Sequence, residues 1–218
     1  MKFKLTPRLS ARLLAAGTAV LLAASAQALP AAQFQPAFEQ FQQAAKGGDG
    51  AIEKSADTFN ALLKSEPANP VLMAYTGAVT AMKANTTWLP WKKMSYAEDG
   101  MALLDKALAM LTTAHDAPLQ HDTPAVLEVR FVAASTFLAV PGFMNRGARG
   151  AKLLMEVLSS PLLTSSPLEF RANVWLAGAT LAAKEKRLDD AHKYLNQVIQ
   201  ANAPQIEAAR AQLKALAS

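Results

Sequence analysis

The sequence predicts an all-α fold, and three observations lead to this prediction. Apolar residues recur every three or four positions along most of the chain, which is the period of an amphipathic helix. Alanine and leucine are abundant, and no alternating strand pattern extends beyond a few residues. Proline or glycine stands at the breaks between the periodic segments. A hydrophobic content of 51% in 218 residues is ample for a packed core.

The clearest unit covers residues 172–203, where two amphipathic segments flank a charged turn. The first segment carries Trp175 on its apolar face and small residues at 177–179, where a second helix could approach closely. The second begins near Asp189, whose negative charge favours a helix N-terminus. It ends before Pro204, because proline disfavours helical backbone in the residue that precedes it.

The same reasoning predicts further helices along the chain. They are expected at residues 31–46, 51–65, 71–84, 100–114, 125–140, 145–159 and 204–217. Pro36 places the start of the first regular helix near that residue. Residues 85–99 are expected to form an insertion ahead of the helix that begins at Gly100.

The unit at residues 172–203 resembles a tetratricopeptide repeat. Trp175 matches the large residue early in that family's first helix, and Ala179 matches its close-approach position. Ala191 matches the alanine of the second helix, and Leu195 the large residue four positions later. Pro204 falls one place later than the family's proline. The family tyrosine and leucine of the first helix are replaced by Ala182 and Gly178.

Upstream segments resemble looser copies of this unit. The small residues that would mark each second helix are Ser55, Gly100, Gly150 and Ala191, which are 45, 50 and 41 residues apart. These spacings exceed the family's repeat of about 34 residues, so the repeats would carry insertions. The resemblance implies a right-handed α-solenoid of tetratricopeptide-like helix-turn-helix repeats.

The first 28 residues have the pattern of a secretory signal peptide. Four cations, Lys2, Lys4, Arg8 and Arg12, precede an apolar run at 13–24. Ala26 and Ala28 then form a small-x-small cleavage site. We expect cleavage after Ala28, which leaves residues 29–218 as one helical-repeat domain in the periplasm or outside the cell. The alternative is an uncleaved anchor, although the run is shorter than the ~20 residues of a spanning helix.

Charge and cysteine content exclude several classes of function. The whole chain has 22 basic and 17 acidic residues. Without the four cations of the signal peptide, 18 basic residues remain, a net charge of +1. This balance does not support nucleic-acid binding, which needs a basic face. The absence of cysteine excludes disulfides and thiolate metal sites.

The first candidate binding surface is the aromatic and basic stretch at residues 88–96. It contains Trp88, Trp91, Lys92, Lys93 and Tyr96. Tryptophan, tyrosine and cations are enriched where proteins bind partners, and a lysine can stack on an aromatic ring. We expect Trp88 to pack inward and Trp91, Lys92 and Tyr96 to border an accessible groove. The alternative is that both tryptophans fill a gap between helices.

This stretch also resembles a group of poorly characterised bacterial envelope repeat proteins. The shared pattern would comprise Trp88, Pro90, Lys92 or Lys93, Tyr96, Gly100, Arg130, and Pro141 with Phe143. The resemblance covers residues 70–160. It implies a fold and carries no known activity.

A second candidate surface is the basic stretch at residues 143–152. Arg146, Arg149 and Lys152 are three residues apart and share one helix face. They lie at a predicted helix N-terminus, where cations oppose the helix dipole. An anion or an acidic partner would relieve this repulsion. The alternative is an ordinary surface turn paired with Glu156 or solvent.

Arg130 lies between Val129 and Phe131 in an otherwise apolar helix. We expect it to be partly buried and paired with an acid, because an unpaired buried charge is costly. The candidate partners are Glu98, Asp99 and Glu128.

The histidines and acids suggest no strong metal or catalytic site. His115 with Asp116 and His121 with Asp122 could bind a divalent ion, but their loop has no fixed spacing. There is no cysteine nucleophile, no GxSxG and no HExxH motif. We therefore expect a protein that is not an enzyme and that needs no cofactor.

These observations favour an exported scaffold or adaptor that binds another envelope protein or a peptide. The alternatives are a small-ligand or anion binder and an enzyme whose site the motifs do not reveal. An open aromatic groove would favour the first, a closed aromatic pocket the second, and a buried acid–base cluster the third.

The cleavage site gives a direct prediction. N-terminal sequencing of the protein purified from the envelope should begin at Leu29, because Ala26 and Ala28 are the only well-placed small pair after the apolar run. A purified envelope protein that begins at Met1 would contradict it.

Overall fold

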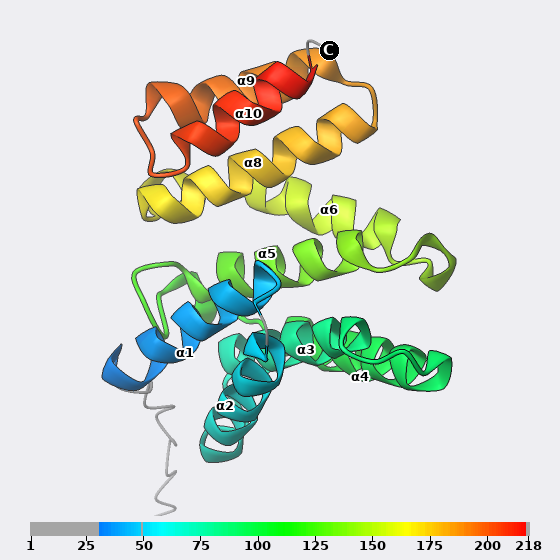
Figure 1. Ribbon diagram of the computed structural model, residues 1–218. Coiled ribbons are helices and arrows are strands. Elements are labelled where there is room, and N and C mark those ends of the chain that lie inside the picture. Colours follow the sequence, from blue (N-terminus) through cyan, green and yellow to red (C-terminus); the bar gives the residue numbers. More distant parts are fainter. Residues whose placement is uncertain (1–30, 49, 217–218) are drawn as a thin grey trace, which may run out of the picture.

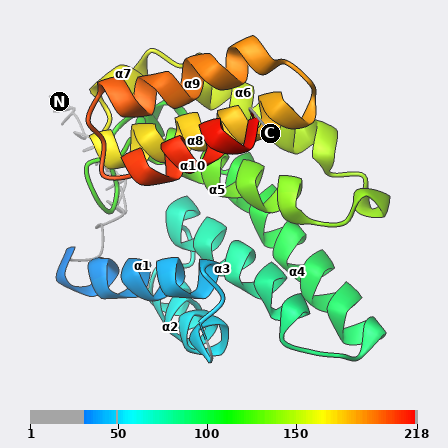
Figure 2. The same cartoon turned by 45° about the horizontal axis from the view of Figure 1, so that its top comes forward.

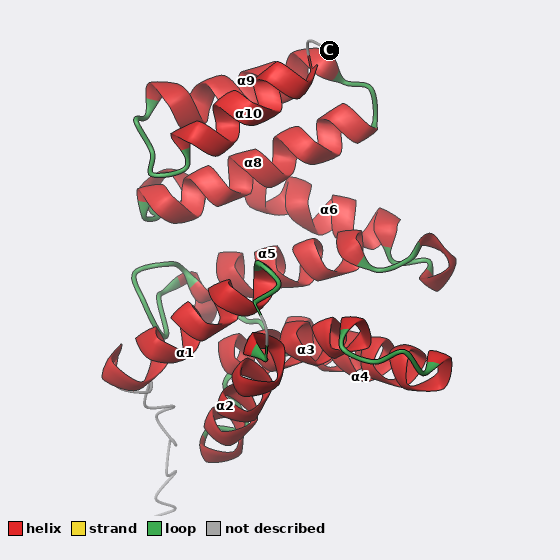
Figure 3. Ribbon diagram, in the orientation of Figure 1, coloured by secondary structure: helices red, strands yellow, loops and turns green. Residues whose placement is uncertain are grey.

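The structure, a computed structural model, describes residues 31–48 and 50–216. These residues form helices joined by turns, without a strand among them (Figure 3). The helices are α1 (Ala31–Ala45), α2 (Ala51–Ser65), α3 (Pro70–Met82), α4 (Pro90–Ala109), α5 (Ala125–Ala139), α6 (Gly147–Leu158), α7 (Leu162–Ser165), α8 (Leu168–Lys184), α9 (Leu188–Gln200) and α10 (Ile206–Leu216). Three single-turn 3₁₀ helices lie at Lys83–Asn85, Thr113–Asp116 and Gly142–Met144. The all-α prediction is confirmed, and the predicted signal segment lies outside the described residues.

Successive helices pack in neighbouring pairs along the chain (Figure 1). The pairs are α1 with α2, α3 with α4, α5 with α6, and α8 with α9, and α10 packs against α9. In Figure 2 the first helix of each pair lies near that of the next pair. None of the described helices combines the length and the apolar character needed to cross a membrane.

Two predicted helix starts are wrong. The first helix begins at Ala31 and contains Pro36 in its interior, where the ring removes a single backbone donor. α4 begins at Pro90, ten residues before Gly100, so the expected insertion is largely helix. The proline occupies the first helical turn, where its missing N–H would have no intrahelical partner anyway.

The closest helix contact joins α3 and α4 at two glycines. A Cβ atom built on Gly100 would lie 2.5 Å from the carbonyl oxygen of Gly77 and 2.6 Å from the backbone nitrogen of Ala81. A Cβ atom on Gly77 would lie 2.8 Å from the carbonyl oxygen of Gly100. The two backbones therefore touch directly, and no larger residue fits at either position. Gly100 is one of the small residues that the sequence predicts for the second helices.

The small residues that mark the second helices are buried at all four positions, namely Ser55, Gly100, Gly150 and Ala191. A Cβ atom on Gly150 would lie 3.1 Å from the carbonyl oxygen of Ala134 on α5. Small side chains thus let the helices of a pair approach closely.

The apolar core has two parts. The larger cluster joins α1 to α6 and extends to Val174 and Leu181 on α8. A smaller cluster lies between α8, α9 and α10, where Leu195 and Val198 are fully buried and Trp175 packs beside them. α8 contributes to both clusters and connects the C-terminal helices to the rest of the protein.

Arg130 is half-buried and paired, as predicted, but with a different acid. Its Nε lies 3.5 Å from Oε2 of Glu156 on α6. Glu128, one of the three expected partners, is buried elsewhere in the core. Residues two apart on a helix face in different directions, so Glu128 and Arg130 cannot share a neighbour easily.

The contact between Gly77 and Gly100 predicts that one added methyl group at Gly100 lowers the stability of the protein. Gly100→Ala should lower the free energy of unfolding by about 1–3 kcal/mol, because the added Cβ must push two helix backbones apart. Gly147→Ala is the matched control, since a Cβ there meets nothing within 4 Å. Thermal unfolding followed by circular dichroism should show a melting point several degrees lower for Gly100→Ala only. Equal melting points for both variants would contradict the contact.

Candidate functional site

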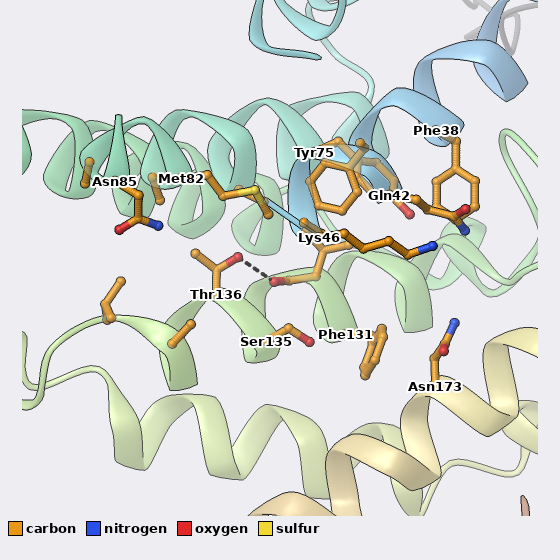
Figure 4. Close-up of a pocket in the computed structure, with 18 of the residues that line it drawn as sticks. Phe38, Gln42, Lys46, Tyr75, Met82, Asn85, Phe131, Ser135, Thr136 and Asn173 are labelled. Atoms are coloured by element: carbon orange, nitrogen blue, oxygen red, sulfur yellow. Dashed lines mark hydrogen bonds between the residues drawn. The ribbon is translucent and has the colours of Figure 1, made fainter. Parts of the chain in front are cut away.

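A groove of about 650 Å³ runs along the first helices of the pairs. Its apolar part is formed by Phe38, Phe41, Tyr75, Met82 and Phe131 (Figure 4). These residues come from α1, α3 and α5, and residues at the start of α8 and just before α10 complete the lining. The groove is partly open, neither an enclosed cavity nor a flat surface. We call this feature the groove.

Helical spacing explains why these side chains meet. Tyr75, Ala78 and Met82 on α3 are three and four residues apart and therefore share one face. Phe131 and Ser135 on α5 have the same spacing. Small residues alternate with the large ones along both helices, and the space above the small side chains forms the hollow.

Carboxamide and hydroxyl groups interrupt the apolar lining. Gln42, Asn85, Ser135, Asn173 and Gln205 contribute these groups (Figure 4). The Nε2 group of Gln205 donates to Oδ1 of Asn173 at 3.1 Å and to the carbonyl oxygen of Glu169 at 3.2 Å. These bonds hold the segment before α10 against α8, and all three residues line the groove.

The groove carries little charge. One cation, Lys46, and one anion, Glu169, line it, and both are exposed. In the projection of Figure 4 the Lys46 side chain extends between Tyr75 and Phe131. A cluster of cations, which a polyanion would require, is not present among the groove-lining residues.

An aromatic cluster supports the α1 and α3 side of the groove. The Tyr75 ring centroid lies 4.8 Å from that of Phe41, 5.2 Å from that of Phe59 and 5.8 Å from that of Phe38. Edge-to-face and offset arrangements such as these stabilise aromatic pairs beyond the area that they bury. The cluster fixes α1 above α3, so the groove has a firm apolar wall.

Behind this wall lies a buried acid–base cluster. The Tyr75 hydroxyl donates to Oε1 of Glu128 at 2.8 Å, and Nε2 of His121 lies 3.0 Å from the same oxygen. The His121 ring also contacts the rings of Phe34 and Phe38, with centroid distances of 4.9 and 5.0 Å. The cluster thus joins α1, α3, α5 and the loop before α5.

Burial sets the protonation of this cluster. Glu128 is 1% exposed, and desolvation raises its pKa to about 8, while the hydrogen bond from Tyr75 opposes this rise. Desolvation lowers the pKa of His121, and the nearby charges of Asp122 and Glu169 act in the opposite direction. Burial, together with the neighbouring Glu128, raises the pKa of Tyr75 well above its usual value. Glu128 and His121 are therefore both predominantly neutral near pH 7.

The predicted aromatic stretch lies away from the groove. Trp88 is 84% exposed and Trp91 is 67% exposed, and Lys92 and Lys93 are exposed beside them. The expectation that Trp88 packs inward is therefore wrong. Its backbone belongs to the turn that leads into α4, at the right-hand end of α3 and α4 in Figure 1.

Tyr96 is half-buried on α4, and the ammonium of Lys83 lies 4.9 Å from its ring centroid. In α4 only Ala97 lines the groove. Trp91, Lys92 and Tyr96 are therefore not among the groove-lining residues. The groove forms from α1, α3, α5 and α8 instead.

The two arginines of the basic stretch are already paired within the chain. Nη1 of Arg146 lies 3.0 Å from Asp105, and Nη1 of Arg149 lies 2.6 Å from the same carboxylate. Both guanidinium groups also lie 5.4 Å from the ring centroid of Phe137. Asp105 of α4 is thus the acidic partner of both arginines. Glu156, the partner expected from the sequence, pairs with Arg130.

The histidine pairs do not form a metal site. His115 closes a capping box with Thr112, whose backbone nitrogen donates to Nδ1 of His115 at 2.9 Å. His121 faces Glu128, as described above. Within the described residues no group of three or more histidine, cysteine, aspartate and glutamate side chains is arranged to hold a metal ion.

The sequence does not distinguish the groove residues from core residues, because both are apolar and recur at helical spacing. α3 and α5 are apolar on nearly every side, with eleven buried residues on α3 and nine on α5. A helix that is apolar all round must contact other groups on more than one face. Apolar residues around the whole circumference of α3 and α5, and not on one stripe alone, therefore indicate that these helices line a groove as well as the core.

Glu128 makes stability depend on pH. Its folded pKa lies above the value of 4.5 expected in the unfolded chain, so its stabilising effect is complete below pH 4.5 and is lost as pH rises to about 8. The lowered pKa of His121 makes stability rise with pH, but only below pH 6.5, the ordinary pKa of histidine. Between pH 6.5 and 8 the free energy of unfolding should therefore fall, by up to about 1.4 kcal/mol per pH unit.

Glu128→Gln tests this pH dependence. The substitution keeps an oxygen for Tyr75 and removes the titration, so urea unfolding should give a flatter profile between pH 6.5 and 8 and a more stable protein at pH 8. Glu156→Gln, at a half-exposed acid, is the control and should keep the wild-type slope. A wild-type slope in Glu128→Gln would show that Glu128 is not the titrating group.

No family model, curated protein or solved structure matches this chain.

Proposed function

We propose that this protein binds an extended apolar segment of another polypeptide in the groove. The observation that carries the proposal is the lining itself, in which aromatic and aliphatic side chains alternate with carboxamides. Apolar walls bury the side chains of a ligand, and a few convergent polar groups orient it. A carboxamide donates and accepts at once, so Gln42, Asn85 and Asn173 can each bond to a peptide unit of either direction.

The shape and charge of the groove favour the same class of ligand. The groove is partly open and its lining spans several helices, which suits an extended chain. One cation and one anion give no net charge, which suits an uncharged segment better than an anion.

A small apolar molecule is the second candidate, and the volume of the groove favours it. About 650 Å³ lies within the ~300–1,000 Å³ of small-molecule sites. The partial openness of the groove favours the peptide over this alternative, because small-molecule sites bury most of their ligand's surface.

The buried acid–base cluster does not support an enzymatic function. Glu128 is sealed in the core, and of the three residues in the cluster only Tyr75 also lines the groove. The Tyr75 hydroxyl donates its proton to a hydrogen bond with Glu128, in the core and not in the groove. A catalytic acid or base must reach the reacting atom within hydrogen-bond distance.

The proposal includes the repeat architecture and the location. We infer that the helix pairs are tetratricopeptide-like repeats that stack as a right-handed solenoid, with the groove on the inner side of the first helices. In this arrangement the groove is the surface that solenoids use for binding. The signal-peptide pattern at residues 1–28 places the expected partner in the bacterial envelope.

Peptide binding can be tested by filling the groove. Ala139 is exposed at the end of α5 and lines the groove, so Ala139→Trp should block it without removing a core side chain. Ala102→Trp, at an exposed position of α4 outside the groove lining, is the matched control. Peptides selected from a random display library on the wild-type protein should bind Ala139→Trp at least tenfold more weakly and Ala102→Trp with unchanged affinity.

Two outcomes would reject the peptide proposal. Selected peptides that bind Ala139→Trp as tightly as the wild type would place the site elsewhere. Native mass spectrometry that finds a bound small molecule on the wild type, absent from Ala139→Trp, would instead support the second candidate.

A further inference from the structure

The turns at one end of the helix pairs expose several large apolar side chains. Trp88 belongs to the turn between α3 and α4, and Trp91 lies in the first turn of α4. Phe143, 67% exposed, belongs to the turn between α5 and α6. Both turns lie at the right-hand end of the helices in Figures 1 and 2. We call the set Trp88, Trp91, Lys92, Lys93 and Phe143 the tryptophan edge.

Packing does not explain these side chains. A tryptophan that stabilises a fold buries most of its large apolar surface, whereas Trp88 and Trp91 leave 84% and 67% of theirs exposed. The third tryptophan, Trp175, is half-buried against the C-terminal core cluster and shows the ordinary structural role. The exposure of Trp88 and Trp91 therefore indicates that they contact another molecule.

The charge around the exposed rings has one sign. From Lys83 to Tyr96 the chain has three lysines and no acid, and Lys92 and Lys93 directly follow Trp91. The turn with Phe143 is followed by Arg146 and Arg149, which share the single carboxylate of Asp105 and so leave a net positive charge. The first acids of α4, Glu98 and Asp99, lie two turns from its start.

We propose that the tryptophan edge binds an anionic lipid surface and holds the protein at a membrane as a peripheral protein. Tryptophan rings settle at the level of lipid headgroups, because they combine a large apolar face with one N–H donor. Lysines beside them attract anionic headgroups while their stems lie along the apolar layer. Exposed rings on neighbouring turns at the same end of the helices suit an extended flat surface, which a membrane presents and a narrow groove does not.

This surface is separate from the groove. None of Trp88, Trp91, Lys92, Lys93 and Phe143 lines the groove. A protein bound to a membrane through the tryptophan edge would thus keep its peptide-binding surface free, and either proposal can fail without the other.

Vesicle sedimentation tests the lipid proposal. The probes are vesicles of equal parts phosphatidylglycerol and phosphatidylcholine, compared with vesicles of phosphatidylcholine alone. All variants are expressed and purified in the same way from the full-length gene, so that they share the same N-terminus and differ only at the substituted positions. The wild type should sediment with the anionic vesicles, less so at high salt, and its tryptophan emission should shift to shorter wavelength.

Three variants separate the contributions. Lys92→Ala/Lys93→Ala should weaken partition into anionic vesicles about thirtyfold, at roughly fivefold for each cation near the surface. Trp88→Ala/Trp91→Ala should reduce sedimentation with anionic vesicles at least tenfold and abolish the spectral shift. Met155→Ala removes an exposed apolar side chain on α6, away from the tryptophan edge, and should bind as the wild type does.

Thermal melts accompany these measurements. Since the substituted side chains are exposed, each variant should unfold within a degree or two of the wild type. The proposal is overturned if the wild type does not sediment with anionic vesicles, or if Trp88→Ala/Trp91→Ala sediments as well as Met155→Ala. Loss of capture of an envelope protein by the tryptophan variant, with no vesicle binding by the wild type, would identify a protein contact in its place.

Discussion

The hydrogen bond between Tyr75 and Glu128 is the constraint on which the first half of the structure depends. It joins α3 to α5 at 2.8 Å, and His121 brings the loop before α5 to the same carboxyl oxygen. An isolated charge at this depth would be very costly, so the carboxyl stays neutral and bonded. The Tyr75 ring then contacts the phenylalanines of α1 and α2. One buried polar contact therefore sets the relative positions of the helices that line one side of the groove.

Small residues have the complementary role of bringing helices together. Gly77 and Gly100 allow α3 and α4 to touch through their backbones, and Gly150 allows α6 to approach α5. The large side chains of α3 and α5 face away from the close contacts with α4 and α6, toward the core or the groove. The groove is thus a product of close packing within the pairs and looser packing between α1, α3, α5 and α8. Alanines on its floor, such as Ala78, keep that space open.

The molecule has two surfaces of different chemistry. The groove is apolar and nearly uncharged, which suits a polypeptide segment held by side-chain burial and a few amide bonds. The tryptophan edge is aromatic and cationic, which suits a surface that presents anionic groups around an apolar layer. Arg146 and Arg149, which the sequence offers as an anion site, are mostly satisfied by Asp105. Exposed cations next to exposed rings, and not cations alone, distinguish the tryptophan edge.

The sequence by itself determined the helical fold, most helix boundaries and the small residues of the second helices, because these follow from local periodicity, turn residues and side-chain size. It also identified the aromatic stretch at residues 88–96 as unusual. Only the tertiary structure decided which way Trp88 points, which acid pairs with Arg130, and that Glu128 is buried beside Tyr75 and His121. The groove, too, is a feature that only the tertiary structure decided. Its lining residues come from segments as far apart as Phe38 and Gln205. Such contacts depend on how whole helices pack, and no local pattern in the sequence encodes the distance between helices.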